Sequence, residues 1–315
     1  MRLAQAVVFA ASLGTAWTLV PPAAAHGFGR EPDDVALRDA TAILLGLIGL
    51  VYLMGLIRRR GILRRAMGVR WRVFGFVGGW LALAAAMIWP LPLWDHGSFA
   101  AHMMEHEILM LVAAPLFAAA RPWAVLRSGL PATWGRRGRS LLRALAVPQF
   151  RRSSMSSWIA FGAHAIALWV WHAPGLFDAA LDSAVVHALQ HACFFGTAFG
   201  FWWVLLARRG SQGDGLAVGL LLLTVVHSGM LGALITFAPH VIYGASTDEV
   251  RHWGLTPLDD QQLGGLIMWV PGGLIYTAAG LFILGRWLKG VEMRARVWRG
   301  VPDAPASVKI KPPTR

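Results

Sequence analysis

Residues 216–237, LAVGLLLLTVVHSGMLGALITF, contain no Asp, Glu, Lys or Arg. A helix of about 20 apolar residues is long enough to cross the hydrocarbon core of a bilayer. The whole chain has 56% hydrophobic and only 14% charged residues, which is too apolar for an ordinary soluble domain. This stretch therefore predicts a membrane-spanning helix in a polytopic membrane protein.

Six further apolar stretches have nearly the same length. They are residues 39–57, 73–89, 102–119, 157–171, 185–206 and 263–284. Within lipid, a helix satisfies all of its backbone polar groups internally, so each stretch is expected to be helical. The sequence predicts an all-α membrane helix bundle with seven transmembrane helices over residues 39–285.

The first 25 residues have the features of a secretory signal peptide. Arg2 is followed by an apolar run over 3–20, and Ala23 and Ala25 fit an A-x-A cleavage rule. The alternative is an uncleaved additional span, which would make eight helices. Residues 26–38 are then expected to be a periplasmic segment and residues 286–315 a basic cytoplasmic tail, disordered in its proline-containing distal part.

Basic residues predict the orientation of the bundle. Of the 29 Lys and Arg residues, 25 lie in segments 58–72, 121–154, 208–209 and 285–315, which alternate with segments that are nearly free of them. The positive-inside rule therefore places the N-terminus outside and the C-terminus inside, as in a bacterial inner (plasma) membrane protein. Because these arginines flank predicted spans and alternate with Trp, they indicate interfacial anchors facing membrane lipid and not nucleic-acid binding.

Two histidine pairs open two of the predicted spans. His102 and His106 are four residues apart, and so are His187 and His191. On a helix this spacing places both rings on one face, about one turn apart. Both spans run inward from the periplasm, so the pairs lie at matching depth and predict a shared metal site. The alternative is that these histidines only form hydrogen bonds between helices.

Other side chains are candidates for the same site. Glu105 and Gln190 flank the two pairs and can act as ligands or as acceptors for an imidazole N–H. His172, His227 and Met230 are possible further ligands, although His227 can equally be a buried hydrogen-bonding residue.

Copper is the predicted metal because it binds imidazole and thioether ligands, and Met103 and Met104 lie next to the first pair. Cys193 is the single cysteine, so neither an intramolecular disulfide nor a Cys-x-x-Cys metal clamp can form.

Three other functions use the same features. His102-x-x-Glu105-His106 also matches the H-x-x-E-H pattern of zinc hydrolases, in which Glu acts as the base. Paired histidines on neighbouring spans can ligate a b-type haem. Gly-rich faces such as Gly264-Gly265 suit close helix contacts in a metal-free scaffold.

Several segments resemble the multi-span CtaG family of cytochrome c oxidase assembly factors. The most specific is WGLTPLDDQQLGGLIMWVPGG over 253–273, in which a polar loop leads into a span interrupted by Pro and Gly. Residues 102–115, His187-x-x-x-His191 followed by Trp202-Trp203, and residues 231–237 are also similar. The resemblance covers about residues 40 to 285.

This resemblance implies a non-enzymatic plasma-membrane protein that is needed to mature a haem-copper oxidase and handles copper for its metal centres. The implied partners are oxidase subunits, with a periplasmic copper donor as a further candidate. The resemblance does not identify the ligands, so the predicted metal site depends on spacing and topology.

Overall fold

The computed structural model describes residues 32–59, 67–88, 97–131, 154–207, 211–244 and 254–300. Within these ranges all regular structure is helical and no strand occurs. The predicted signal peptide over 1–25, residues 26–31 of the following segment, residues 132–153 and the part of the predicted tail after residue 300 lie outside the described residues.

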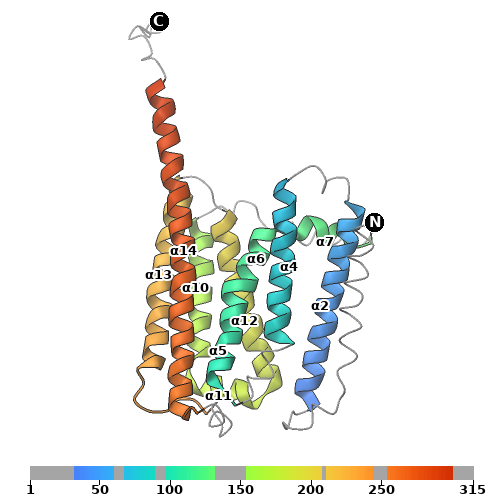
Figure 1. Cartoon of the computed structure of the whole chain (residues 1–315), viewed down its shortest axis with the longest axis vertical. Coiled ribbons are helices and arrows are strands. Elements are labelled where there is room, and N and C mark those ends of the chain that lie inside the picture. The colour runs from blue at the N-terminus through green and yellow to red at the C-terminus, as the bar shows by residue number, and fades with distance from the viewer. Residues whose placement is uncertain are drawn as a thin grey trace, which may run out of the picture.

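The described helices form a bundle of roughly parallel and antiparallel rods (Figure 1). In chain order they are α2 (Pro32–Arg58), α4 (Met67–Met87), α5 (Phe99–Glu107), the π-helix η3 (Ile108–Ala113), α6 (Ala114–Ala120), α7 (Trp123–Gly129), α10 (Ser154–Trp171), α11 (Pro174–Asp182), α12 (Ala184–Ala207), α13 (Ser211–Thr236) and α14 (Pro257–Gly300). In Figure 1 α11 and the start of α5 lie at one end, α7 lies at the other, and α14 projects beyond the bundle at the α7 end.

Five of the described segments are long and apolar enough to cross a membrane: Val35–Arg58, Phe99–Ala120, Ala184–Leu206, Gly213–Thr236 and Pro257–Ala295. The bent pair α10 and α11, at 75°, raises the number to six if it forms one span. The predicted stretch over 73–89 is helical in α4 as far as Met87, but Arg70, Arg72 and several glycines lower the hydropathy of that helix. The count of seven therefore stays a prediction.

Arginine side chains join the helices at the end where α14 projects, which we call the basic end. Arg58 donates to the carbonyls of residues 128, 129 and 130 at 2.9, 3.1 and 3.0 Å. These carbonyls lie at the C-terminal end of α7, where a helix leaves its last carbonyls without partners of its own. Arg121 donates to the carbonyl of Leu206 at 3.1 Å, and Arg286 forms an ion pair with Asp214. His102 and His187 lie at the starts of α5 and α12, at the opposite end of the bundle.

A π-helical segment interrupts the helix that begins at α5. The N–H of Ala114 bonds to the carbonyl of Leu109, five residues earlier. In the same pattern the carbonyl of Met110 would pair with residue 115, but Pro115 has no N–H to donate. The indole N–H of Trp202 donates to Met110 O instead, at 3.0 Å, so α12 supplies the missing hydrogen bond.

Candidate metal centre

The first turn of α5 is held by a carboxylate from α14. Ser98 is the N-cap of α5, and its hydroxyl accepts from the N–H of Ala101 at 3.2 Å. Asp260 is fully buried and accepts from the Ser98 hydroxyl at 2.8 Å and from the N–H groups of Phe99 at 2.6 Å and Ala100 at 3.2 Å. A carboxylate at a helix N-terminus also interacts favourably with the helix dipole. Asp260 therefore fixes the turn from which His102 projects.

The next residue of α14, Gln261, anchors the segment that follows α13. Its side-chain oxygen accepts from the N–H groups of Ile242 at 2.6 Å and Tyr243 at 3.3 Å. Burial, with a smaller effect from the charge of Asp178, raises the pKa of Tyr243 to about 12. The hydroxyl thus stays protonated and donates to the backbone carbonyl of His172 at 2.8 Å. One turn of α14 positions both the start of α5 and the end of α10.

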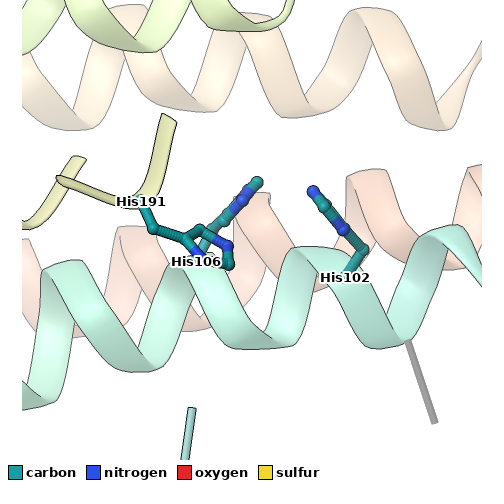
Figure 2. Close-up of side chains that lie close together, drawn as sticks. All are labelled: His102, His106 and His191. Carbon is teal, nitrogen blue, oxygen red and sulfur yellow. The ribbon is translucent and has the colours of Figure 1, made fainter. Parts of the chain in front are cut away.

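Four imidazoles from α5 and α12 meet at this end of the bundle. The ring centroids lie 4.4 Å apart for His102 and His106 and 4.2 Å apart for His187 and His191. Across the two helices, His102 and His187 are separated by 5.0 Å and His106 and His191 by 5.1 Å. In Figure 2 His102 and His106 project from one helix and His191 approaches them from another. The structure therefore brings together both predicted pairs.

Burial leaves several polar atoms of this cluster without hydrogen bonds. His102 and His106 are each 1% exposed and His191 is 8% exposed. Within the described ranges, neither nitrogen of His106 nor Nε2 of His191 has a hydrogen-bond partner, and Nε2 of His191 lies 3.9 Å from Oε2 of Glu105. Gln190 is fully buried, and its amide oxygen and nitrogen also lack partners among those residues. Buried polar groups without partners are costly, and a bound ion is one way to satisfy them.

The described residues contain two groups of three side chains whose ligand atoms all lie within 4.8 Å of one another. We call His102, His106 and His191 the inner triad, and His102, Glu105 and His187 the outer triad. Nitrogen ligands about 2.0 Å from one tetrahedral ion are roughly 3.3 Å apart, so small side-chain rotations would close either triad around a metal. The donor set of imidazoles and one carboxylate fits a first-row transition metal.

His172 lies beside this cluster but in neither triad. Its ring centroid is 6.2 Å from that of His106, and its Nδ1 lies 2.6 Å from the carbonyl of Leu168. Because a carbonyl only accepts, Nδ1 carries the proton, and Nε2 of the neutral ring is left with its lone pair. Nε2 has no hydrogen-bond partner among the described residues, so His172 keeps the form that a ligand needs.

Aromatic side chains close the cluster on its apolar sides. The ring of Phe177 lies 5.2 Å from that of His102, and the ring of Phe194 lies 4.6 Å from that of His106. Met103 is fully buried in a neighbouring apolar cluster with Phe99 and Phe177, whereas Met104 is 40% exposed. A low-polarity wall of this kind strengthens the electrostatic attraction between an ion and its ligands.

His227 and Met230 lie on α13 and belong to neither triad. The ring of His227 packs 5.6 Å from that of Phe161, and Met230 is 52% exposed. The structure therefore does not bring these two predicted candidates into the cluster of paired histidines.

His164 is a buried histidine whose two nitrogens both have partners. The hydroxyl of Thr197 donates to the carbonyl of Cys193 at 2.7 Å, so it accepts from Nδ1–H of His164 at 3.3 Å. Nε2 must then accept from the hydroxyl of Tyr276, at 3.1 Å. His164 thus has the hydrogen-bonding role that is the alternative to metal binding.

Asp260 and Gln261 were not predicted as part of the site. The feature that could have indicated these two residues is a capping box at the start of α14. Asp259 accepts from the N–H of Thr256 at 3.0 Å, and the N–H of Asp259 donates to the Thr256 hydroxyl at 3.2 Å. This box starts α14 at Pro257, six residues before the predicted span. Polar residues in a first helical turn are candidates for contacts to other segments.

These features define a helical protein with several candidate membrane spans and a buried cluster of imidazoles at one end. Residues 50–290 match the model of a family described as cytochrome c oxidase caa3 assembly factor (Caa3_CtaG). The chain belongs to this family of assembly factors, as the resemblance predicted. No curated protein and no solved structure matches it.

Proposed function

We propose that the protein binds copper through the histidine cluster and supplies or holds it for an immature cytochrome c oxidase. The observation that carries the proposal is the convergence of His102, His106, His187 and His191 from two helices, with ring centroids 4.2 to 5.1 Å apart along the sides of the group. Ionisable groups at membrane depth are costly and mark functional sites.

Copper is favoured over other metals for two reasons. Imidazole is a good copper ligand. The family is described as an assembly factor for a cytochrome c oxidase, and the resemblance implies that this client is a haem-copper oxidase. A set of three ligands leaves a coordination position open, which suits an ion that must be released to a client protein.

The proposed topology has seven spans with the N-terminus outside and the C-terminus inside. Arg58, Arg121 and Arg286 lie at the end of the bundle opposite to His102 and His187. By the positive-inside rule the basic end would face the cytoplasm of a bacterial inner membrane. The histidine cluster would then face the periplasm, where a copper donor and the oxidase subunits would reach it.

The experiment is metal analysis of the full-length protein, purified in detergent and incubated with Cu(I). The test variant changes His102, His106, His187 and His191 to Ala, and the control changes His227 to Ala. We expect close to one copper per wild-type and control chain and little copper in the test variant. Copper retained by the test variant would contradict the site.

The same preparation tests the alternative functions. A zinc hydrolase would contain zinc and would lose hydrolysis in Glu105→Gln, since that substitution removes the base. A haem protein would show a Soret band. A wild-type protein that takes up no metal but still assembles oxidase would be a scaffold.

A further inference from the structure

The histidines that the two triads do not share lie at different depths on the same two helices. His102 and His187 are in the first turns of α5 and α12, and His106 and His191 follow one turn later. One turn of four residues is a displacement of about 6 Å along a helix. His102 and His187 stack at 5.0 Å with an interplanar angle of 18°, and form the outer level of the cluster.

The triads also differ in exposure and chemistry. All three histidines of the inner triad are buried, whereas the outer triad contains His187, which is partly exposed, and the carboxylate of Glu105. In the outer triad His102 and Glu105 are also buried, so access comes through His187. The outer triad combines this access with a carboxylate ligand, and the inner triad offers three nitrogen ligands. His102 belongs to both.

We propose that these triads are two successive positions for one metal ion, which is captured by His102, Glu105 and His187 and then held by His102, His106 and His191. The inference rests on the proposed copper-binding function and adds an order to it. Because His102 is common to both positions, the ion exchanges two ligands and keeps the third. It therefore never leaves the protein during the transfer.

Glu105 has a part in both positions. In the outer position its carboxylate is a ligand. In the inner position three neutral imidazoles do not neutralise the charge of the ion. A buried charge without a counter-charge is unfavourable. Oε2 of Glu105 lies 3.9 Å from Nε2 of His191, close enough to supply that charge.

The order of the two positions follows from burial. His187 is the one imidazole of the four that is only partly buried, whereas His106 is 1% exposed and is flanked by Phe194. An ion arriving from outside meets His187 first. It reaches His106 only after passing the level of His102.

The test measures the rate and the equilibrium of Cu(I) transfer from its bicinchoninate complex to the full-length protein in detergent. The loss of colour is followed by stopped flow, and the dissociation constant comes from competition. The variants are His187→Ala for the outer triad, His106→Ala for the inner triad and His102→Ala for both, with His227→Ala as the control. His187→Asn and His106→Asn serve where a melting curve shows that an Ala variant is unfolded.

Wild type and control should take up one ion. His187→Ala should slow copper uptake by about tenfold or more, and it should raise the dissociation constant less than His106→Ala does. His106→Ala should keep the fast uptake but bind about 10- to 100-fold more weakly. His102→Ala should impair both uptake and affinity.

Two results would overturn the two-position inference while leaving copper binding intact. One is equal loss of affinity in His187→Ala and His106→Ala without a change in uptake rate. The other is simultaneous binding of two ions by the wild type. A wild-type protein that takes up no copper would instead overturn the proposed function, and the inference with it.

Discussion

Oδ2 of Asp260 accepts a 2.6 Å hydrogen bond from the backbone N–H of Phe99, which lies 161 residues earlier in the chain. The bond joins the first turn of α14 to the first turn of α5, at the level of His102. Phe99 in turn stacks on Tyr243 at 4.9 Å, and Tyr243 bonds to the carbonyl of His172. The geometry of the histidine cluster thus depends on residues outside it.

Asp260→Asn should reduce both stability and copper affinity. The amide has one acceptor oxygen where the carboxylate has two, and it directs an N–H₂ toward backbone donors, so we expect a loss of about 2 kcal/mol in the free energy of unfolding. Thermal melting in detergent and Cu(I) competition measure the two effects. Asp259→Asn is the control, because Asp259 bonds only to the exposed cap at Thr256 among the described contacts. Equal losses in the two variants would refute a special role for Asp260.

Gly264→Ala should disturb the same contact by crowding it. A Cβ at this position would lie 2.6 Å from Cε1 of Phe99 and 3.2 Å from Cγ of Met103. Overpacking of this kind costs about 1–3 kcal/mol, and the shift of Phe99 should weaken copper binding as well.

Gly273→Ala, on the same helix, is the matched control for Gly264→Ala because no atom lies within 4 Å of its added Cβ. It should leave the melting temperature and the copper affinity nearly unchanged. If Gly264→Ala melts at the same temperature as the wild type, α14 does not pack closely on α5 at this position.

Trp202→Phe should destabilise the π-helical segment. It keeps a ring next to Tyr276 but removes the indole N–H that donates to Met110 O at 3.0 Å. A buried carbonyl without a donor should lower the free energy of unfolding by about 1–2 kcal/mol. Trp158→Phe, at a residue that is 49% exposed, is the control and should have little effect. If both substitutions lower the melting temperature equally, the hydrogen bond has no special contribution.

Arg286→Ala should destabilise the basic end by leaving Asp214 buried without its ion-pair partner. Asp214 is 4% exposed, so the loss should be about 1–3 kcal/mol. Asp214→Ala combined with Arg286→Ala should recover part of that loss, because the uncompensated charge is gone. Strictly additive effects of the two substitutions in thermal melting would show that the pair does not couple.

Local patterns in the sequence were sufficient to predict the all-helical fold and the paired histidines, but not the short helices α7 and α11. The uncharged run over 216–237 lies in α13 except for its last residue, and the spacing of four residues placed His102 with His106 and His187 with His191. These predictions hold because helical periodicity is a local property. Membership in the assembly-factor family was also predicted and is confirmed.

Contacts between distant segments could not be predicted in the same way. The hydrogen bond from Phe99 to Asp260 and the separation of His227 from the cluster depend on how helices pack, and no periodic pattern encodes that. The bend of 75° after Trp171 was missed because Pro174 begins a second helix there. The π-helix could not be predicted because the hydrogen bond to its carbonyl at Met110 comes from Trp202, which lies on another helix.

X-ray absorption spectroscopy of the copper-loaded, full-length protein shows directly whether copper binds at the histidine cluster. We expect nitrogen or oxygen ligands at roughly 2.0 Å and the multiple scattering of imidazole rings. The imidazole signal should be lost in the variant with His102, His106, His187 and His191 changed to Ala. A copper ion held mainly by sulfur, or a spectrum that is unchanged in that variant, would contradict the histidine cluster as the copper site.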